Sequence, residues 1–419
     1  MTSNRLARST AAIAAGGLLW ATCATPAAAD QIRDKQWALK TFEAEKKVWP
    51  VSQGEGVIVG LLDSGVSQEH QDLAGQVLPG ADFSGANSDG RVDSDGHGTS
   101  MASLIVGHGH GAQDGIMGLA PKAKVLPVRL TANGEATGLQ QNSLASAVRF
   151  AVDHGAKVVN MSIGGASRFD SEVREAIGYA ASKDVLLVAA AGNTGGDLKA
   201  VSYPAAFPGV VAVGAVDDGG RVWERSTSGP EVTLAAPGVE VYQATAKSAS
   251  SYGIGNGTSD ATAYVSATAA LIRSKYPGLS AGQVINRMIK SATAPGDGSA
   301  VPNAHYGYGI VDPAKALEAN PAVDGGPRAN PLLGRAESQG APPDSGAVPG
   351  DGASGPPVAA PVAGAGGNAG VTYTLLGAGG LLVLVVAGVA AGLAARARKR
   401  RRAVAASPYP YPPQQPPQW

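Results

Sequence analysis

Residues 57–65 read Val-Ile-Val-Gly-Leu-Leu-Asp-Ser-Gly. The first six form a continuous apolar run, which is typical of a strand buried on both faces of a parallel sheet. The carboxylate of Asp63 follows at once and therefore lies at the carboxyl end of that strand. Functional groups of open α/β sheets gather at this edge. The stretch predicts an α/β fold and marks Asp63 as a candidate functional residue.

Strand-like and helix-like stretches alternate on the C-terminal side of this run. Apolar runs predict strands over 158–161, 185–191 and 210–216. The intervening patterns predict helices over 143–154 and 172–182. Repeated strand–helix units imply a central, mainly parallel sheet with helices on both faces.

Composition excludes some classes of function. The chain has a formal net charge of zero, with 33 basic and 33 acidic residues. Nucleic-acid-binding proteins usually carry a basic excess, so no nucleic-acid partner is expected. The single cysteine, Cys23, lies in a segment that we expect to be removed from the mature protein. Neither a disulfide nor a thiolate metal site is then expected.

The N-terminal residues have the order of a secretory signal. Arg5 and Arg8 precede the apolar run 11–20, and three alanines follow at 27–29. A basic segment, a short apolar segment and an Ala-x-Ala site are the parts of a cleavable signal. We therefore predict a signal peptide over 1–29.

A second apolar stretch lies near the C-terminus and is long enough to cross a membrane. Residues 372–395 carry no charge, and about 20 helical residues span the hydrocarbon core. A basic cluster over 396–402 follows at once, which places the C-terminus inside the cell. We predict a transmembrane helix over 371–395, an extracellular domain and a cytoplasmic tail over 396–419.

Composition separates a folded domain from a spacer. The strand and helix patterns occupy residues 30–320, which we predict to form one domain with a short N-terminal extension. Residues 321–370 are dominated by Pro, Gly and Ala and contain no aromatic side chain. Such a segment buries too little apolar surface to offset its chain entropy, so a flexible linker is predicted. The Pro-rich tail after 402 is a candidate polyproline ligand, although an inert tail is favoured.

Two motifs place polar side chains at predicted helix starts. Asp-Gly-His-Gly-Thr at 95–99 precedes the apolar run 101–106, so His97 is expected to begin a helix. Gly-Thr-Ser at 257–259 precedes a small-residue helix over 261–276. A helix N-terminus offers free backbone N–H groups and the positive end of the dipole to a developing oxyanion.

Asp63, His97 and Ser259 together supply the groups of a serine hydrolase. The serine hydroxyl attacks a carbonyl carbon, the imidazole takes and returns its proton, and the carboxylate holds the imidazole in one tautomer. The chain order Asp, His, Ser is that of subtilisin and not that of chymotrypsin or the α/β-hydrolases. A second Asp-Ser-Gly at 344–346 lies in the predicted linker, where no paired-carboxylate cleft can form, so an aspartic protease is rejected.

Through these motifs, residues 31–317 resemble the subtilase family. Within it they are most similar to the mycosins, the membrane-anchored serine proteases of actinobacterial type VII secretion systems. The likeness to mycosins rests on the opening 31–37, a segment before residue 57 too short for a folded prodomain, the spacer and the C-terminal span. Two departures stand out: the mature chain has no cysteine for loop disulfides, and Ala263 stands where subtilases usually have proline.

The resemblance implies a subtilisin-like three-layer fold and further site residues. Asn193 is implied to donate its side-chain amide to the oxyanion. The residues implied to pair with the substrate backbone as an edge strand are Ser162, Ile163, Gly164 and Gly165. Those implied to line the specificity pocket are Ala189, Ala190, Ala191 and Gly192.

No metal ligand is predicted. His108 and His110 have no third ligand at a suitable spacing and are expected in a solvated loop. Carboxylates that gather before His97 follow no recognisable calcium-loop spacing, so structural calcium stays open without support. These carboxylates are Asp82, Asp89, Asp93 and Asp95. Catalysis is expected to require no cofactor.

The sequence predicts a membrane-anchored extracellular serine endopeptidase that cleaves secreted or envelope proteins through an acyl-enzyme intermediate. Its expected partners are protein or peptide substrates, the membrane and the type VII secretion machinery. Two alternatives stay open. One is a largely structural component of a secretion complex, and the other is a general cell-surface subtilase.

Overall fold

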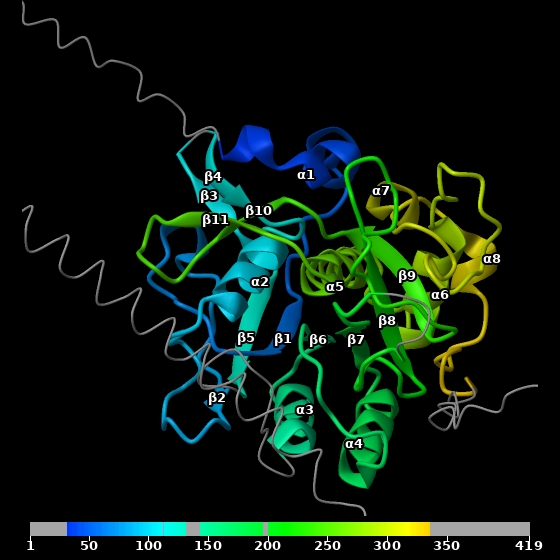
Figure 1. Ribbon diagram of the computed structural model, residues 1–419, viewed down its shortest axis with the longest axis horizontal. Helices are drawn as coiled ribbons and strands as arrows, with labels where there is room; N and C mark the ends of the chain where they lie inside the picture. Colours follow the sequence, from blue (N-terminus) through cyan, green and yellow to red (C-terminus); the bar gives the residue numbers. More distant parts are fainter. Residues whose placement is uncertain (1–31, 112, 131–142, 196–199, 336–419) are drawn as a thin grey trace, which may run out of the picture. The chain divides into compact units, whose positions relative to one another are not determined.

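The computed structural model describes residues 32–111, 113–130, 143–195 and 200–335 (Figure 1). The strands are β1 (Ile58–Asp63), β2 (Ala81–Asp82), β3 (His108–His110), β4 (Asp114–Met117), β5 (Lys124–Arg129), β6 (Val158–Met161), β7 (Leu186–Ala190), β8 (Val210–Val216), β9 (Val232–Pro237), β10 (Val241–Ala244) and β11 (Tyr252–Gly255). The helices are α1 (Trp37–Thr41), α2 (His97–Val106), α3 (Ser143–Asp153), α4 (Ser171–Ser182), α5 (Thr258–Lys275), α6 (Ala281–Ser291), α7 (Pro313–Ala316) and α8 (Pro321–Asp324). Single turns are η1 (Arg33–Lys35), η2 (Ala44–Val48) and η3 (Gln71–Leu73).

Seven strands form one parallel sheet in the order β2-β5-β1-β6-β7-β8-β9. β1 lies inside the sheet, with Gly60 opposite Leu126 of β5 and Val159 of β6. The continuous apolar run is therefore a strand with neighbours on both edges. The prediction of an α/β fold with a central parallel sheet is confirmed.

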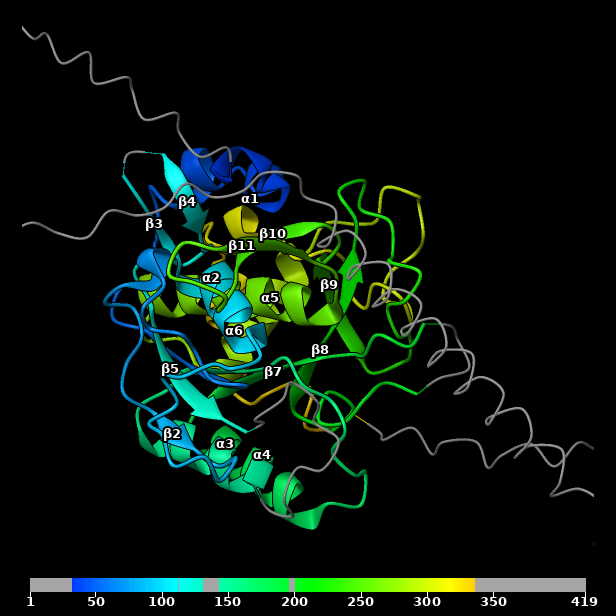
Figure 2. The ribbon, with the colours of Figure 1, turned by 60° about the vertical axis from the view of Figure 1, so that its left-hand side comes forward.

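Helices cover both faces of the sheet, in three layers (Figures 1 and 2). Successive strand residues point to opposite faces, so Leu61 packs in the core with α2 and α5, whereas Leu62 packs in the core with α3 and α4. The same alternation holds for Val158 and Val159 of β6. This period of two explains why the central strands are apolar on both faces, apart from Asp63 at the end of β1 and Asn160 in β6.

Helix α5 runs through the layer opposite α3 and α4, beside α2 (Figure 2). Almost its whole length is buried, from Thr258 to Arg273, which its small residues permit. The nucleophile of the predicted triad thus lies on a helix held on all sides by the core. A rigid element of this kind fixes the position of the side chains at its first turn.

The N-terminal extension is folded and packs against the domain. The Trp37 indole Nε1 donates to the Val239 carbonyl oxygen at 3.1 Å, and the Gln36 amide donates to the Met117 carbonyl oxygen at 2.8 Å. The Phe42 ring meets the Tyr264 ring of α5 edge to face, with centroids 5.6 Å apart. The segment before β1 therefore contributes to the core next to α5.

The C-terminal part of the domain extends beyond the predicted boundary at 320. Arg287 of α6 is buried and forms a two-pronged ion pair with Asp324 of α8, with both nitrogen–oxygen distances 2.7 Å. Leu332 is 6% exposed and packs in the main core. Residues 321–335 are thus part of the fold, and the predicted linker starts too early. The amino-acid composition of a segment cannot reveal the few contacts that hold it to the domain.

Among the described residues, no helix is both long and apolar enough to cross a membrane. The predicted signal peptide over 1–29, the transmembrane helix over 371–395 and the tail over 396–419 all lie outside the described residues.

Candidate active site

The carboxyl end of β1 and the start of α2 bring Asp63 and His97 together. Asp63 Oδ1 lies 2.8 Å from His97 Nδ1 and also accepts a hydrogen bond from the Ser64 backbone N–H. The Asp63 carboxylate is 2% exposed, whereas the imidazole is 36% exposed. A buried carboxylate on Nδ1 fixes the tautomer and leaves Nε2 free for proton transfer.

The electrostatics of His97 are set by three carboxylates. Burial of the ring lowers its pKa, but the charge and hydrogen bond of Asp63 raise it, and the charges of Asp260 and Asp95 add to this. The net effect raises the pKa of His97 to about 9. The imidazole must lose this proton before it can act as a base.

The loop before α2 is tied to the end of β1 by Asp93. Its Oδ1 accepts from the Ser64 hydroxyl at 2.9 Å, and its Oδ2 accepts from the Thr99 backbone N–H and hydroxyl at 2.8 and 2.6 Å. Gly96, the residue before the helix, adopts a left-handed backbone with φ +101°, which favours glycine. Asp93 thereby joins the two elements that carry Asp63 and His97.

Ser259 is the second residue of α5, as its motif predicted, and its side chain is buried. Its hydroxyl donates to the Ser162 carbonyl oxygen at 3.1 Å. The Ser162 hydroxyl in turn donates to the Ser259 carbonyl oxygen at 3.1 Å. In this arrangement the Ser259 hydroxyl uses its single proton in the hydrogen bond to Ser162. The side chain must therefore rotate before it can transfer this proton to His97.

Asn193 follows β7 and is oriented by the start of α5. Its Oδ1 accepts from the backbone N–H and the hydroxyl of Thr258, both at 2.9 Å. With the oxygen engaged, the amide Nδ2 is left to donate elsewhere, and it lies 3.4 Å from the position that a Cβ on Gly257 would take. The Ser259 backbone nitrogen lies 3.5 Å from the same point. Two donors therefore converge beside Gly257.

The residues expected to contact substrate lie at the ends of β6 and β7. Ser162 to Gly165 follow β6 directly, with Ser162 buried and Gly165 exposed and at φ +97°. Gly192 has φ +119°, and a Cβ there would lie 2.6 Å from Ser202 Oγ, so a larger residue does not fit. The alanines expected to line the specificity pocket, 189 to 191, are at most 5% exposed.

The other sequence candidates serve structural roles. His108 and His110 form strand β3 of a two-stranded hairpin with β4, so the expected solvated loop is wrong. His110 Nδ1 lies 2.6 Å from Asp72 Oδ1, and a buried acceptor of this kind favours an ordered strand over a loop. Of the carboxylates weighed as calcium ligands, Asp82 bonds the hydroxyls of Ser84 and Ser88. Among the described residues, no three His, Cys, Asp or Glu side chains form a metal-sized cluster.

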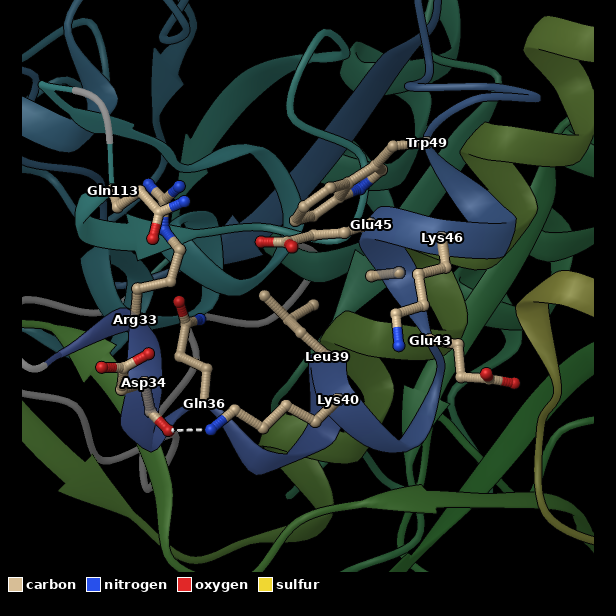
Figure 3. Close-up of a pocket in the computed structure, with 11 residues that line it drawn as sticks. Arg33, Asp34, Gln36, Leu39, Lys40, Glu43, Glu45, Lys46, Trp49 and Gln113 are labelled. Atoms are coloured by element: carbon tan, nitrogen blue, oxygen red, sulfur yellow. Dashed lines mark hydrogen bonds between the residues drawn. The ribbon is translucent and has the colours of Figure 1, made fainter.

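A cavity of about 260 Å³ lies between the N-terminal extension and the residues before β4 (Figure 3). Charged side chains of both signs surround Leu39 and Trp49 in it, and Lys40 Nζ donates to the Asp34 carbonyl oxygen at 2.6 Å. None of the triad residues lines this cavity. It is separate from the site assembled above.

Sequence reasoning missed one residue of the site, Asp260. It follows the nucleophile, is 3% exposed, and burial raises its pKa to about 7 against the opposing charge of His97. The signal that identifies it is a charged residue in the first turn of a helix whose next charged residue, Arg273, lies in its last turn.

Comparisons with known proteins agree with this geometry. The profile described as the subtilase family matches residues 54–309. Subtilisin DY from Bacillus licheniformis is 34% identical over 285 residues, which cover 67% of this chain and 98% of the relative. The structure of MycP1 from Mycobacterium smegmatis is 29% identical, with a TM-score of 0.62 and coverage of 70% of this chain and 87% of that one. The MycP3 protease from the type VII (ESX-3) secretion system is 31% identical, with a TM-score of 0.58 and coverage of 68% and 88%.

Proposed function

The chain belongs to the subtilase family of serine proteases, and from this premise we propose that it is a membrane-anchored, extracellular endopeptidase of the mycosin kind. In this proposal it acts on secreted or envelope proteins and belongs to a type VII secretion system. The observation that carries the chemistry is the Asp63–His97 pair at 2.8 Å beside the first turn of α5, where Ser259 lies.

The proposed reaction is acyl transfer. Ser259 Oγ turns from the Ser162 carbonyl to His97 Nε2, gives up its proton there and attacks the substrate carbonyl carbon. The resulting oxyanion is placed beside Gly257, where Asn193 Nδ2 and the Ser259 backbone N–H donate. His97 returns the proton to the leaving amine, and water then releases the acyl group by the same steps in reverse order.

The assignment to a secretion system is supported by the similarity to MycP1 and MycP3. In one solved structure, the serine protease MycP1 is described as an essential component of the type VII (ESX-1) secretion system. That MycP1 is 30% identical to this chain. The apolar stretch 372–395 with its basic flank supports anchoring, because it is long enough to cross a bilayer.

A fluorophosphonate probe tests the proposed nucleophile. The wild-type protein is expected to be labelled, and Ser259→Ala is expected to lose all labelling while its melting temperature stays within a few degrees. Ser162→Ala is the matched control, since it removes a neighbouring hydroxyl and keeps the nucleophile. Equal labelling of wild type and Ser259→Ala would refute the assignment of Ser259.

A largely structural role in a secretion complex is the second candidate. It is favoured by the similarity to MycP1, a serine protease described as an essential component of the type VII (ESX-1) secretion system. Export of secreted proteins in a deletion strain, complemented by wild type or by Ser259→Ala, separates the two. Full rescue by Ser259→Ala means that proteolysis is dispensable for export, whereas no rescue means that it is required.

A further inference from the structure

Asp260 lies directly after the nucleophile, yet the reaction described above does not use it. Its side chain is 3% exposed, and its Oδ1 is buried without a hydrogen-bond donor among the described residues. A buried carboxylate oxygen without a donor is costly, so a group of this kind beside reacting atoms points to a chemical role.

The carboxyl group of Asp260 lies close to the oxyanion donors. Its Oδ2 is 3.4 Å from the position that a Cβ on Gly257 would take, and Asn193 Nδ2 is 3.4 Å from the same position. The two atoms are therefore no more than twice that distance apart. A negative charge at such a range opposes a second negative charge between the donors, because little water screens it there.

Asp260 also acts on His97. The two groups lie on the first turns of adjacent helices α5 and α2. The charge of Asp260 raises the pKa of His97, and the charge of His97 lowers that of Asp260. The negative charges of Asp63 and Asp95 also act on the imidazole of His97.

The remaining neighbours of Asp260 do not neutralise it. Tyr264 lies one turn along α5, and its hydroxyl is buried without a partner in the described chain. Burial raises the pKa of Tyr264, and the charge of Asp260 raises it further. The side-chain amide of Gln243, on β10, is neutral. This amide and Asp260 Oδ1 both lie close to Gly255. Among the described residues, His97 is thus the cation whose charge reaches Asp260.

We propose that Asp260 is a positioning residue that restrains the triad: its carboxylate repels the oxyanion that forms beside Gly257 and adds to the effect of Asp63 in favouring the imidazolium form of His97. Loss of its charge therefore accelerates formation of the acyl-enzyme. This inference rests on the proposed function, because it concerns the reaction of Ser259.

The size of the expected acceleration depends on pH, whereas the effect of a packing defect would not follow the titration of these two groups. Below about pH 7 Asp260 is protonated, so a neutral replacement changes little. Between about pH 7 and 9 Asp260 is ionised and His97 is protonated, so a neutral replacement lowers the pKa of His97 and increases the fraction of neutral imidazole, while Asp63 still favours the protonated form. Above about pH 9 His97 is neutral in both proteins, and only the repulsion of the oxyanion still slows the wild type.

The test measures the rate of inactivation by a fluorophosphonate from pH 5 to 10. Asp260→Asn and Asp260→Ala are both expected to react several-fold to about tenfold faster than wild type near pH 8, and about equally near pH 5.5, since one unit of pKa is a factor of ten. Glu172→Gln is the matched control: it also neutralises a carboxylate in the first turn of a helix, but an exposed one, and its profile is expected to follow the wild type.

Imidazole NMR titration in the Ser259→Ala background gives a second readout, because it reports the pKa of His97 without catalysis. Asp260→Asn is expected to lower that pKa. Unchanged rate profiles, or an unchanged His97 titration, would overturn the inference. Failure of the proposed function looks different, since the wild type itself would then not react with the fluorophosphonate at any pH.

Discussion

At the scale of single residues, the two ends of the Asn193 amide have different tasks: the oxygen binds Thr258, and the nitrogen faces the proposed oxyanion position. Its oxygen receives two hydrogen bonds from Thr258, which leaves the amide nitrogen as the donor beside Gly257. A side chain held in this way is oriented before substrate binds. Electrostatic stabilisation of an oxyanion depends on such prior orientation, because no reorganisation is needed during the reaction.

Asn193→Ala is therefore expected to lower kcat by about 10²–10³ and to change KM little, since the lost hydrogen bond forms chiefly in the transition state. Steady-state kinetics on a peptide substrate measure both constants. Thr258→Val is the companion variant: it removes one of the two bonds that orient the amide and keeps the amide itself, so a smaller loss is expected. An intact kcat in Asn193→Ala would remove this residue from the oxyanion site.

Asp63 and Asp260 both raise the pKa of His97, but they differ in contact. Asp63 accepts the Nδ1 hydrogen bond, whereas Asp260 acts through its charge. Asp63→Asn is expected to lower kcat by about 10⁴, because the amide no longer holds the correct tautomer, and to move the acid limb of the kcat/KM profile from about pH 9 to lower pH. The pH dependence of kcat and kcat/KM measures both effects. A lower kcat with the acid limb at an unchanged pH would contradict the effect of the Asp63 charge on the pKa of His97.

At the scale of elements, the N-terminal extension is joined to the nucleophile helix by an aromatic contact and by a hydrogen bond from the Ser52 hydroxyl to the Leu271 carbonyl oxygen at 2.9 Å. Phe42 is 5% exposed and packs edge to face on Tyr264, which is one turn from Asp260. The segment lies before the part that matches the subtilase family, which begins at residue 54. Its packing makes it part of the folded domain in this structure.

Phe42→Ala is expected to lower the free energy of unfolding by about 3–5 kcal/mol, as is typical of a phenylalanine removed from a core. Urea unfolding followed by fluorescence measures this. The control is Phe169→Ala, because Phe169 is 79% exposed and its loss is expected to change stability by less than about 0.5 kcal/mol. Similar small effects of both variants would show that the extension packs loosely.

The same elements show what sequence patterns can and cannot predict. Residues 158–161 and 210–216 were predicted as strands and are β6 and β8, because continuous apolar runs are specific for strands buried on both faces. The hairpin strand His108–His110 was missed, since its order depends on Asp72, a distant residue that no local pattern reveals. The folded end at 321–335 was missed for the same reason, because its anchor, Arg287, lies on another helix.

In the predicted site, too, local patterns could be predicted and contacts between distant residues could not. Asp63, His97 and Ser259 stand in short motifs beside elements whose ends can be located in the sequence. Their positions at a strand end and two helix starts are those observed. The influence of Asp260 on His97 depends on the approach of α2 to α5, which only the tertiary fold determines.

At the scale of the whole molecule, the sheet order explains how distant residues meet. The adjacent strands β1, β6 and β7 end at one edge and deliver Asp63, Ser162 and Asn193 there in turn. Helices α2 and α5 begin in the same region and supply His97 and Ser259. Since all five positions depend on one sheet, the domain is expected to keep its activity when residues 371–419 are removed.

Removal of the predicted anchor tests this expectation together with the membrane assignment. The full chain is expected in the membrane fraction and to resist extraction at high pH, because an uncharged stretch of this length spans the roughly 30 Å hydrocarbon core. A chain ending at residue 370 is expected in the soluble fraction, with undiminished fluorophosphonate labelling, since it keeps every residue of the described fold up to Arg335. Replacement of the basic residues 396–402 by glutamine is the matched control for orientation, because it keeps the apolar length and removes the positive charge that retains the C-terminus inside. A full chain that stays soluble would contradict the anchor and leave the protease itself intact.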